Sequence, residues 1–170
     1  MSFPADVSPA ELLYPDLEQE LASTRKMIAL VPDGNDDYKP HAKSMAIGPL
    51  ATHLAELPTF AMAILTTSEL DFATTKWEQK LVNTTADRLE MFDRNAREMT
   101  SGIAAAEWDK LSEKWTMRAG DQVYFTDAKG KLLRSFAINH MAHHRAQLGV
   151  YLRLLGIAIP GTYGPSADEM

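Results

Sequence analysis

The sequence predicts an all-α protein, an up-and-down bundle of four helices that forms a single domain over residues 1–170. Apolar side chains recur at intervals of three and four residues in four segments, as they do on the buried face of an amphipathic helix. Clusters of Pro, Gly, Asn and Asp separate these segments. The composition, with 45% hydrophobic and 24% charged residues, is typical of one folded domain of this length.

The first helix is expected to run from Ser8 to about Val31. Ser8 can accept a hydrogen bond at the start of a helix, Pro9 fits the first helical position, and Glu11 completes a capping box. Residues at helical spacing then mark the buried face: Leu13, Leu17, Leu21, Thr24, Ile28 and Val31. Residues 32–37, rich in Pro, Gly, Asn and Asp, end this helix and open a polar loop.

Two further helices are expected in the middle of the chain. One covers about residues 44–68, and Pro58 inside it could kink the helix because proline has no backbone N–H. The other covers about residues 83–100, and Gly102 is expected to stop it. Both segments carry apolar residues along one side, so we expect both to pack in the bundle.

The pattern changes before the last helix. Residues 115–118 and 122–126 flank an Ala-Gly-Asp turn, and this arrangement predicts a short extended pair. The last helix is expected to begin near Lys131 and to end at Gly156, because glycine closes helices readily and a proline follows shortly after it. The tail at 157–170 is rich in turn-forming residues, so we expect irregular structure there.

Charge and residue usage exclude several classes of function. Lys and Arg number 17 against 23 for Asp and Glu, and no basic block could neutralise a run of phosphates, so a nucleic-acid partner is not expected. The absence of cysteine excludes disulfides and thiolate ligands and leaves histidine and carboxylate as metal ligands. The first twenty residues do not resemble a signal peptide, and no apolar run reaches membrane-spanning length. We therefore expect a cytoplasmic protein with no membrane partner.

His140 and His144 form the most informative pattern in the sequence. They are separated by about 40° around the last helix, so both imidazoles are expected to point toward the core. Such a pair can bind one transition-metal ion through two nitrogens. Met141 stands where the zinc peptidases have a glutamate, so peptidase chemistry is not predicted. His143 lies nearer the edge of the buried stripe and is expected to stay outside the metal site.

His53 is the candidate third ligand, because it lies on the apolar side of the second helix, where a polar side chain has no packing role. Any one buried histidine could instead be a core residue that binds a backbone carbonyl or water. Three of them without a shared purpose would need three separate sets of hydrogen-bond partners. The pattern therefore favours one divalent ion at about 2.0–2.2 Å from the three imidazoles.

Three other polar residues are interpreted as structural, and a fourth, Tyr151, as a neighbour of the site. His41, in a polar loop, is expected to be exposed or to pack within that loop. Glu56 and Asp93 lie beside the buried stripes of their helices, and we expect them to form surface salt links, with support of the metal ligands as the alternative. Tyr151 lies one turn beyond Gln147 and is a candidate lining residue of the site.

Three parts of the chain carry a family likeness: residues 38–56, residues 139–148 with 151–156, and residues 160–169. They resemble the DinB-like superfamily of small bacterial four-helix proteins, which is related by fold to metal-dependent thiol transferases that use low-molecular-weight thiols. In that family one histidine on the second helix and two histidines on the last helix bind a divalent metal. These positions match His53, His140 and His144. Ala146 stands where the family motif often has glycine.

The resemblance implies a metal-dependent enzyme that acts on a small molecule, by thiol transfer to an electrophile or by a related isomerisation or hydrolysis. Three imidazoles leave coordination positions for water or substrate, and imidazole suits zinc or nickel, with iron as a further candidate. No residue is identified as a catalytic acid or base. The alternative is a non-catalytic metal-binding or stress-responsive protein that acts through a partner.

The expected partners are a small-molecule substrate, a low-molecular-weight thiol where the chemistry is thiol transfer, and a second copy of the chain. Bundles of the family that this chain resembles commonly pair through a helix face. Trp77, Trp108 and Trp115 lie in segments that could leave aromatic surface exposed, so we expect a homodimer.

Overall fold

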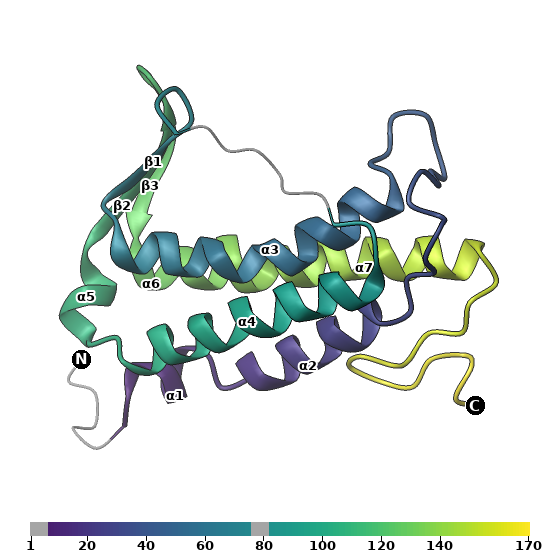
Figure 1. The fold of residues 1–170 in the computed structure, drawn as a ribbon. Coiled ribbons are helices and arrows are strands. Elements are labelled where there is room, and N and C mark those ends of the chain that lie inside the picture. The colour runs from purple at the N-terminus through teal and green to yellow at the C-terminus, as the bar shows by residue number, and fades with distance from the viewer. Residues whose placement is uncertain (1–6, 76–81) are drawn as a thin grey trace.

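Four long helices lie side by side in the structure, a computed structural model that describes residues 7–75 and 82–170 (Figure 1). They are α2 (Leu17–Ile28), α3 (Ile47–Thr66), α4 (Thr85–Ala104) and α7 (Asn139–Leu154). The short helices α1 (Pro9–Leu13), α5 (Trp108–Ser112) and α6 (Lys129–Leu132) gather at one end of the bundle, together with three strands. The predicted four-helix bundle is therefore confirmed.

The first expected helix is divided in two, which corrects the prediction of one helix over 8–31. Residues 14–16 separate α1 from α2. Pro15 has no N–H for the helix, and it disfavours helical geometry at the residue before it, Tyr14, whose backbone has φ −136° and ψ 48°. The capping box of Ser8 and Glu11 at the start of α1 is confirmed.

Helices α3 and α4 run parallel to each other, so the expected up-and-down order is wrong. Both begin beside the loop that follows α2: the Gly48 N–H donates to the carbonyl of Asp36 (3.0 Å), and the Thr85 N–H donates to Asp33 Oδ1 (2.7 Å). Figure 1 shows both helices starting at the same end of the bundle. The long connection over 67–84 makes this possible, because it can extend to about 60 Å, twice the roughly 30 Å length of either helix.

A small sheet corrects the all-α expectation. Strands β2 (Lys114–Ala119) and β3 (Gln122–Ala128) form the expected extended pair, an antiparallel hairpin with Gly120 at φ +57° in its turn. The third strand, β1 (Glu69–Asp71), was not predicted and pairs in parallel with β2. Asp71 Oδ1 accepts a hydrogen bond from the Gly120 N–H (2.9 Å), which ties β1 to the hairpin turn.

The last expected helix begins and ends close to its predicted limits. It comprises α6, a π-helical segment η1 (Leu133–Ile138) and α7, and the change to π geometry was not predicted. Gly156 ends it at φ +74°, with hydrogen bonds from the Ile157 N–H to Leu152 O and from the Gly156 N–H to Arg153 O (both 3.0 Å). This pair of bonds is a Schellman motif, so the predicted glycine stop is confirmed. Residues 157–170 contain no helix or strand.

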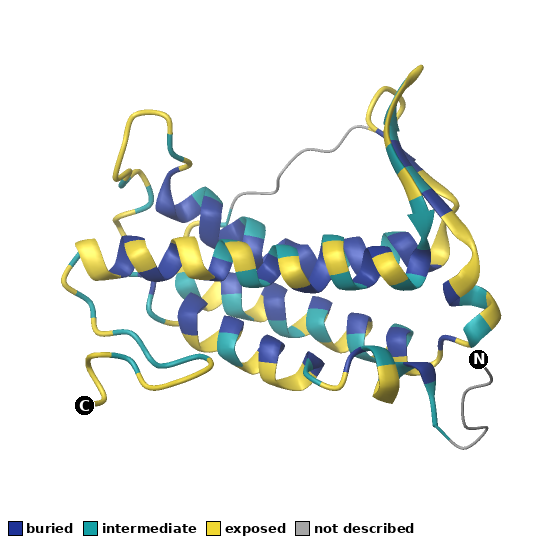
Figure 2. Ribbon diagram, turned by 180° about the vertical axis from the view of Figure 1, so that it is seen from behind, coloured by how far each residue is buried: buried dark blue, intermediate teal, exposed yellow. Residues whose placement is uncertain are grey.

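The core lies between the four long helices and continues beneath the sheet. Figure 2 shows buried residues on the faces that the helices turn toward one another. Trp115 on β2 is 0% exposed, and its indole N–H donates to Thr67 Oγ1 (2.9 Å). Trp115 therefore offers no aromatic surface to a partner, Trp108 is partly exposed, and Trp77 lies outside the described residues. The homodimer stays a prediction.

No helix among the described residues combines the length and apolar character that a bilayer crossing requires.

The sequence predicted that Gly102 would end α4. It lies instead inside α4, where α4 packs closely against α3. A Cβ atom at this position would lie 2.6 Å from Met62 Sδ and 3.2 Å from Leu65 Cδ1. A side chain at position 102 would therefore have to displace the ends of Met62 and Leu65, which fill the space between the two parallel helices.

A Gly102→Ile substitution is expected to lower the free energy of unfolding by about 2 kcal/mol, because overpacking outweighs a helix-propensity gain of less than about 1 kcal/mol. Urea denaturation followed by circular dichroism measures the change. The matched control is Gly164→Ile in the tail, where a Cβ would meet nothing within 4 Å. Equal stability of the two variants would contradict a tight α3–α4 contact.

Candidate metal centre

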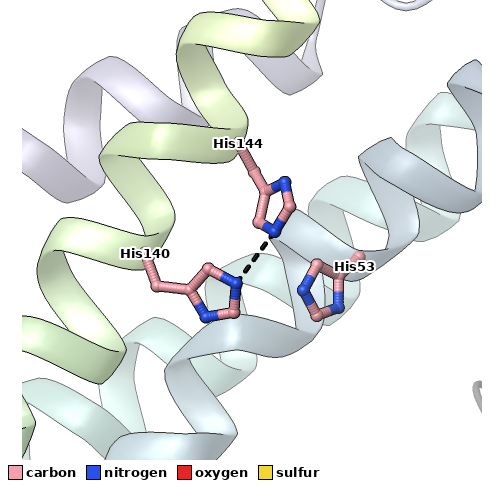
Figure 3. Close-up of side chains that lie close together, drawn as sticks. All are labelled: His53, His140 and His144. Atoms are coloured by element: carbon pink, nitrogen blue, oxygen red, sulfur yellow. Dashed lines mark hydrogen bonds between the residues drawn. The ribbon is translucent and has the colours of Figure 1, made fainter. Parts of the chain in front are cut away.

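Three imidazoles from two helices meet at the seam between α3 and α7 (Figure 3). His53 comes from α3, and His140 and His144 come from α7. The Nε2 atoms of His140 and His144 lie 2.9 Å apart. The ring centre of His53 lies 5.4 Å from that of His140 and 4.8 Å from that of His144. One nitrogen atom from each ring lies within 4.8 Å of the others, so the structure brings together the three histidines that the sequence singled out.

The three rings are partly buried, and burial is the main reason that their pKa values fall. The pKa of His53 is lowered to about 4, first by burial and then by the neighbouring His144 and His140. Burial also lowers the pKa of His140 and of His144, although a hydrogen bond to Gln147 partly opposes this change at His144. All three imidazoles are therefore neutral near pH 7, which is the state that can bind a metal ion.

Hydrogen bonds at the Nδ1 atoms of His144 and His140 indicate whether their Nε2 atoms carry a free lone pair. His144 Nδ1 lies 2.7 Å from Gln147 Oε1, and an N–H donated to this oxygen leaves the lone pair on His144 Nε2. The backbone carbonyl of Phe136 favours a proton on the His140 ring, whose Nδ1 is buried without a hydrogen bond of good geometry.

With the His144 Nδ1–H donated to Gln147 Oε1, either position of the His140 proton leaves one polar group of the metal-free pair unsatisfied. If both rings carry Nδ1–H, two Nε2 lone pairs face each other at 2.9 Å. If His140 carries its proton on Nε2, its buried Nδ1 lone pair has no donor. A cation bound at the two Nε2 atoms would accept both lone pairs and leave the protons on Nδ1. The contacts of these Nδ1 groups with Gln147 and with the Phe136 carbonyl would then orient the two rings. The residues present fit a metal ion.

Arg145 fixes the rotation of α7 on the side away from α3. Its guanidinium lies 2.8 Å from the carboxylate of Glu20 on α2, and both side chains are less than 5% exposed. It also donates to the Glu20 carbonyl (3.0 Å) and to Thr24 Oγ1 (3.1 Å). Tyr163 in the tail closes the network, because its hydroxyl accepts from Arg145 and donates to Glu20 (both 2.8 Å). Sequence reasoning assigned Arg145 no role, although it lies between buried Met141 and Leu148 at helical spacing.

The other histidines lie outside the cluster. His143 is exposed on α7, as expected from its phase. His41 is exposed in the loop before α3, where its Nδ1 accepts a hydrogen bond from the Lys43 N–H (3.1 Å). Tyr151, expected to line the site, is buried, and its hydroxyl donates to the carbonyl of Met45 (3.1 Å). Tyr151 therefore holds α7 against the residues that precede α3.

The two acidic residues beside the buried stripes differ in their surroundings. Asp93 forms the expected surface salt link, with its carboxylate 2.7 Å from Arg25 Nε. Glu56 is only 8% exposed, so it lies inside the protein and not at the surface, where the sequence placed it. It lies one turn after His53 on α3, on the side that packs into the bundle.

Known proteins share both the sequence pattern and the fold. The sequence profile described as "DinB family" matches residues 1–170. The Bacillus subtilis protein YrdA is 48% identical over 40 residues, a match that covers 24% of this chain and 23% of that protein.

Solved structures are similar over most of the chain. A DinB-like protein of Bacillus cereus has a TM-score of 0.67 at 18% identity, covering 90% of this chain and 97% of its own. YjoA, a DinB-like protein of Bacillus subtilis, has a TM-score of 0.66 at 18% identity, with coverage of 89% and 97%. YfiT of Bacillus subtilis, described as "a probable metal-dependent hydrolase with an unusual four-helix bundle topology", has a TM-score of 0.66 at 13% identity, with coverage of 93% and 95%. At these identities the likeness shows the fold.

Removing Glu20 is expected to destabilise the protein strongly. Glu20→Ala leaves the Arg145 charge buried without its carboxylate partner, so the free energy of unfolding should fall by about 3 kcal/mol. Chemical denaturation measures this change, with Glu18→Ala on the exposed face of α2 as the matched control. If the two variants are equally stable, Arg145 does not anchor α7 through this pair.

The metal-free protein is expected to lose stability as the pH falls from about 6.5 to about 4. The pKa of His53 is lower in the folded chain, so the unfolded chain binds more protons in this range. His53→Gln should therefore reduce the loss of stability between pH 7 and pH 5, whereas His41→Gln, in the exposed loop, should not. Thermal melts with a chelator present at the two pH values make the comparison. Equal losses in the wild type and in His53→Gln would contradict the lowered pKa.

Proposed function

Because the chain belongs to the DinB family, we propose that it is a metal-dependent enzyme that acts on a small molecule and holds one divalent ion with His53, His140 and His144. The supporting observation is the convergence of three neutral imidazoles in a cluster that, within the described residues, includes no fourth histidine or carboxylate ligand. A closed structural zinc site takes four protein ligands. Three ligands leave a position for water or for an atom of the substrate, as catalytic sites do.

The ligand set favours zinc or nickel, and iron also accepts imidazole nitrogen. When bound at these nitrogens, such an ion supplies a Lewis acid that lowers the pKa of a coordinated water or thiol. Because the chain has no cysteine, a thiol that takes part in the reaction comes from a second small molecule.

The protein's own residues keep the ligands in the correct state. Burial holds the three imidazoles neutral, and the hydrogen bond between His144 Nδ1 and Gln147 orients the His144 ring. Phe60 and Phe136 lie beside the rings of His53 and His140, so that side of the cluster is apolar. Apolar surroundings strengthen the electrostatic effect of a cation on a bound substrate.

Two reaction classes fit this arrangement: hydrolysis of a small substrate and transfer of a low-molecular-weight thiol to an electrophile. The description of YfiT as a probable metal-dependent hydrolase supports the first class. Untagged protein loaded with zinc or nickel, incubated with ester and amide substrates and separately with thiols and electrophiles, distinguishes the classes by product analysis. Metal binding without turnover in either assay would favour the non-catalytic alternative.

Metal binding is expected to require His144 and not its neighbour His143. His144→Gln should weaken zinc affinity by about 100-fold or more, since changes at residues that only support ligands already cost about 10–100-fold. His143→Gln should leave affinity unchanged, because this side chain is exposed outside the cluster. Isothermal titration of chelator-treated, untagged protein measures both. Loss of binding in His143→Gln with retention in His144→Gln would show that the wrong member of the pair had been assigned.

A further inference from the structure

The side of the histidine cluster that faces the hairpin is formed by phenylalanines. We propose that Phe60, Phe125 and Phe136, which we term the phenylalanine wall, form a subsite for an aryl or similarly flat apolar group of the substrate. The polar atom of the same molecule then occupies the histidine cluster. This inference rests on the proposed function and specifies the class of substrate.

The phenylalanine wall is continuous with the histidines. The ring centre of Phe136 lies 5.4 Å from that of His140, at an interplanar angle of 38°. The ring centre of Phe60 lies 6.4 Å from that of His53. Phe60 on α3 and Phe136 on η1, the segment that leads into α7, meet edge to face with ring centres 5.5 Å apart.

The third ring extends the wall from the bundle to the sheet. Phe125 on β3 lies 5.4 Å from Phe136, between ring centres, and 6.3 Å from Trp115. A molecule that reaches from the histidines along these rings would thus contact α3, η1 and β3 in turn. The position of the hairpin is fixed independently, because Trp115 donates to Thr67 at the end of α3.

Exposure distinguishes two members of the wall from ordinary core residues. Phe125 and Phe136 are partly exposed, whereas Leu133 and Ala137, on the same helical rod as Phe136, are 0% and 1% exposed. Apolar surface that remains accessible beside a polar cluster gains free energy when a ligand covers it. Aromatic rings favour an aromatic ligand in particular, because they accept edge-to-face and offset contacts.

The π-helical segment places Phe136 in this role. Phe136 belongs to η1, and His140 follows four residues later at the start of α7. Their rings contact each other, so the segment in which the helical geometry changes presents an apolar ring and a polar ring on the same side. Departures from α geometry of this kind occur often at functional sites.

Two hydroxamates test the subsite, because they carry the same metal-binding group and differ in the presence of a phenyl ring. The affinities of benzohydroxamate and acetohydroxamate for the zinc-loaded protein are measured by isothermal titration. In the wild type, benzohydroxamate should bind about tenfold more tightly. In Phe136→Ala the ratio of the two affinities should fall to about threefold or less, whatever the change in the affinity for acetohydroxamate itself. Comparison of the ratio between variants cancels the intrinsic difference between the two compounds.

Two further variants control for folding and for nonspecific apolar binding. Phe136→Leu keeps an apolar side chain of similar size, so it should fold and still lose most of the aryl preference. Phe72→Ala removes an exposed aromatic ring that pairs with Tyr124 on the sheet, away from the histidines, and should keep the full preference.

The outcomes separate the subsite from the metal site. Zinc binding with an equal hydroxamate ratio in the wild type, Phe136→Ala and Phe136→Leu would overturn the aryl subsite and leave the proposed function standing. A failure of the wild type to bind zinc would overturn the proposed function and the subsite together. A lowered ratio in Phe72→Ala to the same extent as in Phe136→Ala would show that the apolar contact lies elsewhere.

Discussion

Three imidazole rings share a partly buried space in which they cannot all be positively charged. Burial lowers the pKa values of all three, most of all that of His53, and leaves neutral rings with one nitrogen each within 4.8 Å of the others. In the metal-free protein the Nε2 atoms of His140 and His144 share a hydrogen bond (2.9 Å), and a bound cation would instead accept a lone pair from each of the three rings. The chemistry that the site can support depends on this constraint.

The rest of the structure holds the two histidine-bearing helices in the required rotation. On one side α7 presents His140 and His144 to α3, and on another its Arg145 forms a buried ion pair with Glu20 of α2. The tail reaches the same network through Tyr163, so residues far apart in sequence support one helix face. A buried ion pair stabilises the fold only when its two charges keep their hydrogen-bonding geometry, because a displaced partner leaves a buried charge uncompensated. The pair therefore favours the one rotation of α7 in which Arg145 meets Glu20.

The sequence predicted local features better than long-range ones. The helix stop at Gly156 and the capping box at Ser8 follow from neighbouring residues, and the histidine cluster follows from helical phase and family likeness. Parallel α3 and α4 could not be predicted, because a four-helix pattern does not specify how a long connection crosses the bundle. Strand β1 has three residues, too few for a recognisable alternation, and pairs with a distant strand. The partner of Arg145 lies on another helix, and helical spacing along α7 alone cannot identify it.

The most direct test of a three-histidine metal centre is a crystal structure of the zinc-loaded, untagged protein, with the ion located by anomalous scattering at the zinc edge. We expect one peak between α3 and α7, about 2.0–2.2 Å from one nitrogen each of His53, His140 and His144, with His143 in solvent. A peak coordinated by other residues, or full occupancy of zinc elsewhere with the three imidazoles still in mutual contact, would contradict the assignment.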